Sequence, residues 1–180
     1  MAGRRSRGRG KAKGSMAGTA TRLAGSHDHQ LCIEEALESA AQLCVARGAR
    51  FTTLRRRVLE LVWGSHQPIK AYDILERLSE TDRAAKPPTV YRALDFLIGQ
   101  GLVHRLESLN AFVGCPHPGQ DHDYQFLICD GCGTVAEIAA PAVRAALAAH
   151  AAGLGFTIKR QTIEVYGTCR ECARGRVATA

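Results

Sequence analysis

In the first half of the chain, hydrophobic residues recur at three- and four-residue intervals, which predicts amphipathic helices. The repeat predicts four helices, over residues 30–47, 53–64, 71–79 and 90–99. Thr89 stands before the fourth helix as its predicted N-terminal cap, after a break at Pro87 and Pro88. Two short alternating segments, 102–106 and 111–114, then predict a β-hairpin.

The last three helices and the hairpin follow the order of a winged helix-turn-helix domain. The fourth helix has the recognition position, and its periodicity leaves Tyr91, Arg92 and Asp95 exposed. The N-terminal part of such a helix enters the major groove of DNA. Arginine can bind guanine there with two hydrogen bonds, and tyrosine can contact a phosphate or a thymine methyl. The alternative interpretation is an ordinary solvated helix face.

The hydrophobic pattern changes after residue 125. Segments 126–128 and 135–138 predict strands, 141–152 predicts an alanine-rich helix, and 156–166 predicts a long strand. A unit of this size buries too little apolar surface to be stable by itself. We therefore expect it to self-associate, with the long strand at the interface between two copies.

These elements predict an α+β fold with an N-terminal winged helix-turn-helix domain and a small C-terminal α/β dimerisation domain. The predicted organisation is a basic tail, the winged-helix domain, a linker, the dimerisation domain and a short tail, over residues 1–28, 29–114, 115–125, 126–174 and 175–180.

Charge changes this picture only at the N-terminus. The formal net charge of the 180 residues is +7, and residues 1–22 hold seven basic side chains and no acidic one. We predict that this tail is disordered, and that it either attracts nucleic acid non-specifically or only adds solubility. The sequence has neither the apolar segment of a signal peptide nor a run long enough to span a membrane. We therefore expect a cytoplasmic protein without a membrane partner.

Two Cys-x-x-Cys pairs, Cys129/Cys132 and Cys169/Cys172, bracket the predicted dimerisation domain. Four thiolates in two such pairs can complete the tetrahedral coordination of a structural zinc ion. Two disulfides, or one redox-active pair, are the alternatives. The expected reducing compartment and the odd number of seven cysteines favour metal or redox chemistry over structural disulfides.

A second group of metal-binding residue types lies near the predicted linker: His104, Cys115, His117, His122 and Glu137. A metal held by some of them could clamp the linker to the hairpin. Each could instead be an ordinary solvated or core residue. Three ligands with Glu137 as a base would resemble a zinc hydrolase, but the chain lacks the HExxH motif of such enzymes.

The run AKPPTVYRALDFLIGQGLVHRLES, followed by Cys115, His122, CDGCGTVAE and CREC, resembles the ferric uptake regulator family over about residues 30–172. The resemblance is to its zinc-sensing branch, the zinc uptake regulators. It implies a dimeric, non-enzymatic repressor that binds palindromic operator DNA and controls zinc uptake genes, with about two zinc ions per protomer and no small-molecule substrate. The residues that it implies are Cys129, Cys132, Cys169 and Cys172 for structural zinc, His104, Cys115, His122 and Glu137 for regulatory zinc, and Tyr91 and Arg92 for DNA.

One departure from the iron-sensing branch is informative. That branch carries a histidine-rich run before the first cysteine pair, whereas this chain has DHDYQFLIC, with His122 as the only histidine. Fewer nitrogen ligands and the thiol of Cys115 favour zinc over iron. The remaining alternatives are an iron or peroxide sensor of the same family and a redox switch that binds DNA without sensing metal.

Overall fold

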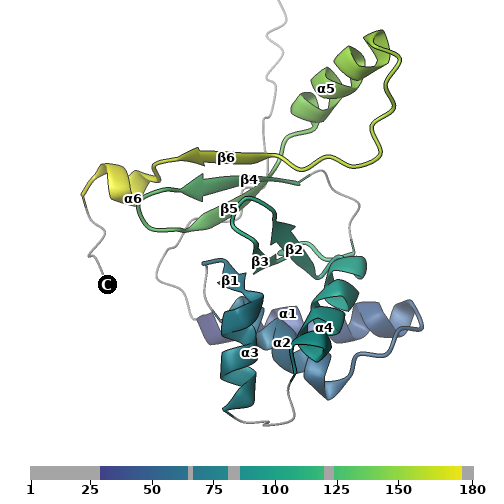
Figure 1. Ribbon diagram of the computed structural model, residues 1–180, viewed down its shortest axis with the longest axis vertical. Coiled ribbons are helices and arrows are strands. Elements are labelled where there is room, and N and C mark those ends of the chain that lie inside the picture. Colours follow the sequence, from purple (N-terminus) through teal and green to yellow (C-terminus); the bar gives the residue numbers. More distant parts are fainter. Residues whose placement is uncertain (1–28, 65–66, 81–85, 120–123, 176–180) are drawn as a thin grey trace, which may run out of the picture.

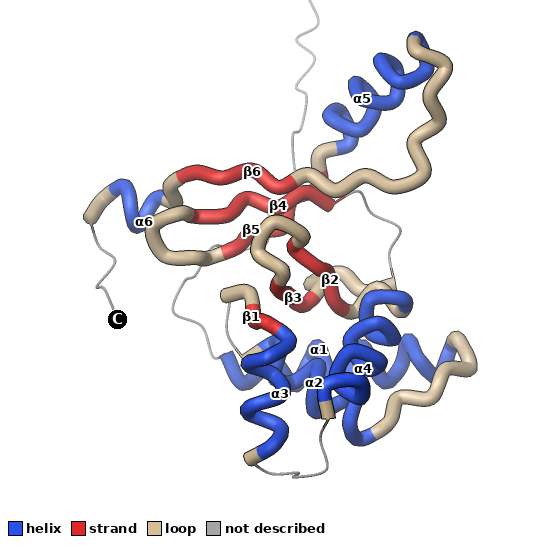
Figure 2. Tube along the Cα trace, in the orientation of Figure 1, coloured by secondary structure: helices blue, strands red, loops and turns tan. Residues whose placement is uncertain are grey.

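The computed structural model describes residues 29–64, 67–80, 86–119 and 124–175. The predicted N-terminal tail and His122 lie outside these ranges. Within them, helices α1 to α4 form one end of the molecule, a three-stranded sheet of β4 to β6 forms the other, and strands β1 to β3 lie between them (Figure 1; Figure 2). The α+β fold class is confirmed.

The N-terminal half is a winged helix-turn-helix. Its helices are α1 (His29–Ala46), α2 (Thr53–Trp63), α3 (Ala71–Ser79) and α4 (Pro87–Gly99). Their apolar faces meet in one core, where Leu59, Ile74, Leu94 and Leu97 are fully buried. These contacts fix α4 against α2 and α3 and leave its polar face in solvent.

The cap of α4 differs from the prediction. The helix begins at Pro87, its N-cap is Lys86, and Thr89 lies inside the first turn, where its N–H donates to the Lys86 carbonyl at 2.9 Å. Proline has no N–H to leave unsatisfied and already has a helical φ, so it suits the first helical positions. The two prolines therefore start the recognition helix instead of preceding it.

Strands β2 (Val103–Leu106) and β3 (Ala111–Gly114) form the predicted hairpin, which we call the wing together with its turn. Asn110 closes the turn at φ 46°, a left-handed conformation that asparagine tolerates. Ile69 and Lys70, which lie between two predicted helices, form a third strand, β1, against β3. Two residues are too short to show strand alternation.

The C-terminal sheet has the order β5-β4-β6. Its strands are β4 (Tyr124–Cys129), β5 (Val135–Ala139) and β6 (Glu164–Gly167). The predicted long strand over 156–166 is wrong, because only its end forms β6. Strand β6 runs parallel to β4 and pairs Glu164 with Phe126, so in the same register the residues before Thr162 would lie beyond the start of β4 at Tyr124.

The wing packs on this sheet and links the two halves. Leu106 from the wing, with Phe126 and Ile128 from β4, forms a buried cluster that Leu109 and Val113 of the wing also contact. Leu106 and Phe126 are fully buried. The wing therefore forms part of the β-sheet of the N-terminal half and contributes Leu106 to the hydrophobic core of the C-terminal half.

Helix α5 (Pro141–Gly153) extends away from the sheet (Figure 1), and no residue of this fully described helix is buried. Val143 and Leu147 on α5, and Leu127 and Val165 on the sheet, are exposed. The chain continues through β6 to a short helix, α6 (Arg170–Ala173). In the described part of the chain, no helix is both long and apolar enough to cross a membrane.

Candidate metal centres

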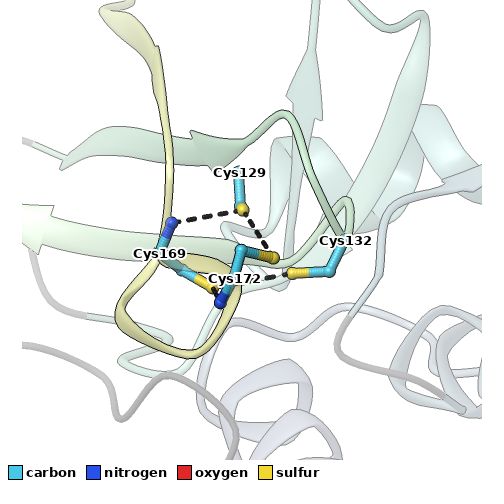
Figure 3. Close-up of side chains that lie close together, drawn as sticks. All are labelled: Cys129, Cys132, Cys169 and Cys172. Atoms are coloured by element: carbon cyan, nitrogen blue, oxygen red, sulfur yellow. Dashed lines mark hydrogen bonds between the residues drawn. The ribbon is translucent and has the colours of Figure 1, made fainter. Parts of the chain in front are cut away.

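The four paired cysteines converge at the end of the C-terminal sheet (Figure 3), and we call this group the cysteine site. Cys129 ends β4, Cys132 lies in the turn before β5, and Cys169 and Cys172 belong to the N-cap and the body of α6. All four sulfurs lie within 4.8 Å of one another. The structure therefore brings together the two cysteine pairs that the sequence analysis predicted at the two ends of the C-terminal domain.

The sulfur spacing matches tetrahedral zinc. The Cys129 and Cys172 sulfurs are 3.6 Å apart, and those of Cys132 and Cys169 are 3.8 Å apart. Four sulfurs at zinc–sulfur distances of about 2.3 Å would be about 3.8 Å from one another. All seven cysteines are free thiols, and each lies in the described part of the chain. The residues present therefore fit a four-thiolate zinc ion.

Backbone amides already favour negative charge in this site. The N–H of Cys169 donates to the Cys129 sulfur at 3.2 Å, and such hydrogen bonds lower the pKa of Cys129 to about 6. The Thr134 side chain lowers the pKa of Cys132. Desolvation and the neighbouring cysteines raise the pKa of Cys172. Ionisation of one of these thiols therefore opposes ionisation of its neighbours, and a bound divalent cation would offset this repulsion.

Gly131 lies tightly against this group. A Cβ at this position would stand 2.8 Å from the Cys172 sulfur and 3.2 Å from its Cβ. The turn between Cys129 and Cys132 therefore lets the two halves of the site approach only because residue 131 has no side chain.

We expect Gly131→Ala to weaken metal retention, because the added methyl pushes Cys172 from its position. Changes beside metal ligands reduce affinity by about 10- to 100-fold. Zinc loss to a competing chelator measures this. Gly167→Ala is the matched control, since a Cβ there meets nothing within 4 Å. Equal zinc retention by both variants would contradict this packing argument.

A second group joins the wing to the C-terminal sheet, and we call it the interdomain site. It consists of His104 on β2, Cys115 after β3 and Glu137 on β5, with one ligand atom of each within 4.8 Å of the others. His104 Nε2 lies 3.3 Å from Glu137 Oε2. All three are buried. The structure thus brings together three of the four residues predicted for regulatory zinc, and the fourth, His122, lies outside the described residues.

The surroundings of this site are apolar. The His104 ring packs at a tilt of 44° against the Tyr124 ring, with centroids 3.9 Å apart, and its centroid lies 5.5 Å from that of Phe126. Burial, then the Glu137 carboxylate, raise the pKa of Cys115 to about 12. The thiol is therefore protonated until a cation replaces its proton. Nitrogen, sulfur and carboxylate donors buried together are a zinc-type set.

His117, the other candidate near this site, is not part of the described three-residue group. Its backbone forms a hydrogen bond with Cys115, which lowers the thiol pKa against the larger effect of burial. His117 therefore supports Cys115 through the main chain of the loop.

The candidate DNA-contacting residues lie on the exposed face of α4. Tyr91 is 52% exposed and Arg92 is also exposed, while Val90 and Leu94 on the opposite face are buried. On the inner side, the Arg55 guanidinium of α2 lies 3.4 Å from the Phe96 ring centroid of α4. This contact helps to hold the recognition helix, and no sequence motif marks it.

Comparisons with known proteins agree with this arrangement. The model of the ferric uptake regulator family matches residues 46–166. The zinc uptake regulation protein of Escherichia coli K12 is 43% identical over 140 residues, which cover 77% of this chain and 82% of that protein.

Two solved structures are also similar. A zinc uptake regulator complexed with zinc and DNA has a TM-score of 0.76 and 42% identity, and the match covers 79% of this chain and 96% of that one. Holo XcZur has a TM-score of 0.72 and 45% identity, over 78% of this chain and 98% of that one.

Proposed function

The chain belongs to the ferric uptake regulator family, and on this basis we propose that it is a zinc-responsive, homodimeric transcriptional repressor of zinc uptake genes. The observation that carries the proposal is the interdomain site, where His104, Cys115 and Glu137 join the wing to the C-terminal sheet. The similar regulator was solved with zinc and DNA bound, which supports zinc and DNA as ligands of this protein. Family membership favours a regulator over the zinc hydrolase considered from the sequence.

The cysteine site is proposed as structural. Cys129, Cys132, Cys169 and Cys172 would hold zinc, which supplies charge neutralisation and cross-links the β4–β5 turn to α6. The cluster of Leu106, Phe126 and Ile128 is small, so this cross-link would contribute much of the stability of the C-terminal half.

The interdomain site is proposed as regulatory, with His122 as its fourth ligand. His104 and Cys115 come with the wing, whereas Glu137 comes from β5, so the three donors meet only when the wing lies on the sheet. Zinc binding therefore favours one arrangement of the recognition helix relative to the dimerisation domain. A coupling free energy of about 1–3 kcal/mol would change DNA affinity by about 5- to 150-fold.

A second copy of the chain would complete the DNA-binding unit. Helix α5 has no buried residue, and its exposed Val143 and Leu147 side chains form an apolar surface that could pack against a second copy of the chain. A dimer with two-fold symmetry would place its two α4 helices in successive major grooves, about 34 Å apart. We infer that the operator is palindromic for this reason.

Selection of duplexes from a random pool by the zinc-loaded protein tests this function. We expect enrichment of a palindrome with half-sites about one helical turn apart, and no enrichment after the protein is treated with a chelator. Enrichment of the same sequences by both forms would support the redox switch instead. Failure to enrich any sequence would contradict the repressor assignment.

Replacing Arg92 with alanine is expected to cost about 1–3 kcal/mol of operator binding and to relax the base preference at one position of each half-site. Titration of base-substituted duplexes measures both effects. Lys159→Ala is the control, because it removes one exposed positive charge from the C-terminal half, remote in sequence from α4. An equal loss on every duplex would make Arg92 a phosphate contact.

A further inference from the structure

The turn of the wing is held on the C-terminal sheet by Glu164 at the start of β6. One oxygen of the Glu164 carboxylate accepts a hydrogen bond from the backbone N–H of Glu107 at 2.7 Å. The other accepts from the N–H of Ser108 at 3.2 Å and from its hydroxyl. The Ser108 hydroxyl also forms a hydrogen bond with the Tyr166 hydroxyl. Residues more than 50 positions apart thus meet through one carboxylate.

The register of the sheet relates this contact to the interdomain site. Phe126 on β4 pairs with Glu137 on β5 and with Glu164 on β6. Residues paired across neighbouring strands point to the same face of a sheet. Glu137, Phe126 and Glu164 therefore form one row, with Phe126 packed against the wing and a carboxylate on each side of it.

Both carboxylates in this row act on the same hairpin. Glu137 meets His104 in the middle of β2, and Glu164 binds the turn that follows Leu106 at the end of that strand. Only the first contact involves metal-binding side chains. The second joins a carboxylate to two backbone N–H groups and uses none of the candidate metal ligands.

Two further polar contacts cross the same boundary. Arg160 lies 3.8 Å from the Glu107 carboxylate and is 81% exposed, so solvent screens this ion pair. The Gln67 side chain donates to the Cys132 carbonyl at 3.0 Å, near the cysteine site. Of the four hydrogen bonds described above between the wing turn and β6, three end on Glu164 and one joins Ser108 to Tyr166.

We propose that Glu164 is a positioning residue that docks the wing on the C-terminal sheet before the interdomain site binds zinc. Its consequence for metal sensing rests on the proposed function. Docking brings His104 and Cys115 opposite Glu137, so the docked fraction of the metal-free protein sets the apparent zinc affinity. Glu164 therefore sets the zinc concentration at which the protein responds, without contacting the metal.

Glu164→Gln in the full-length dimer tests the proposal, with Glu35→Gln on the exposed face of α1 as a charge-matched control. In metal-free interdomain sites, we expect the Glu107 and Ser108 amides to exchange about tenfold faster in Glu164→Gln, because the charged acceptor that protects them is lost. Zinc titration should give an apparent dissociation constant about 5- to 10-fold higher at this site. Glu35→Gln should match the wild type in both amide exchange and apparent zinc affinity.

A merely structural role would give a different pattern. We expect Glu164→Gln to retain the zinc of the cysteine site and the dimer, and to reach wild-type operator binding at saturating zinc. Loss of that zinc, of the dimer or of the plateau would overturn the proposal, as would unchanged amide exchange and zinc affinity. Ser108→Ala removes the two hydrogen bonds of the hydroxyl but keeps both backbone N–H donors to Glu164, so it should shift both readouts in the same direction by less.

The two proposals fail separately. Amide exchange at residues 107 and 108 reports docking whether or not the protein senses zinc. Wild-type protein that binds its operator equally with and without zinc would end the proposed function. Fast exchange in Glu164→Gln with unchanged zinc affinity would instead end the positioning role.

Discussion

Replacing Cys169 with serine is expected to unfold the C-terminal half of the protein and to abolish the dimer. Cys169 is the N-cap of α6, and its N–H and sulfur both face the other cysteines. Structural zinc sites in small domains contribute apparent binding free energies of about 10–16 kcal/mol at neutral pH, and this energy is available only when the domain is folded. Three remaining thiols cannot close the tetrahedron.

Zinc content, sedimentation and thermal unfolding measure this effect together. We expect Cys169→Ser to lose the zinc of the cysteine site, to sediment as monomer or aggregate and to lose the unfolding transition of the C-terminal half. Cys32→Ser is the control, because Cys32 is a free thiol on α1 outside both metal groups. A folded Cys169→Ser dimer with unchanged zinc would disprove the structural role of this site.

Replacing Cys115 with serine is expected to remove the zinc response while leaving the fold intact. Cys115 is buried at the interdomain site, and serine keeps its approximate size. The serine hydroxyl ionises far less readily than a thiol and is a poorer ligand for zinc, so the site loses its sulfur donor. The ratio of operator affinities with and without zinc should fall from about 5- to 150-fold to nearly one.

The measurement is a mobility-shift titration at two free zinc concentrations, with zinc content determined on the same samples. Cys115→Ser should retain the zinc of the cysteine site and lose the second ion, whereas Cys32→Ser should behave as the wild type. A variant that still binds its operator only with zinc would remove Cys115 from the regulatory set.

Hydrophobic periodicity was sufficient to predict helices α1 to α5 and the wing, because each is a local element, but it did not predict the four-residue helix α6. The errors arose where the bounds of an element depended on a proline or on pairing with another strand. Pro87 and Pro88 entered α4 instead of breaking the chain before it. Only the end of the predicted long strand formed β6, because β6 pairs with β4 from Phe126 onward, and periodicity along one segment cannot reveal this pairing.

The two candidate sites differ in how far the sequence could predict them. Cys-x-x-Cys spacing identified the cysteine site directly. Spacing alone left the interdomain site open, since His104, Cys115 and Glu137 are far apart in the chain and meet only through the docking of the wing. The role of Glu164 had no sequence signal, because it depends on the β4–β6 register.

We propose that zinc at the interdomain site controls operator affinity. The most direct test is to titrate one selected palindromic duplex with wild-type protein, once zinc-loaded and once with the interdomain site emptied by a mild chelator that leaves the cysteine site filled. We expect the zinc-loaded form to bind about 5- to 150-fold more tightly. Equal affinities of the two forms would contradict the account.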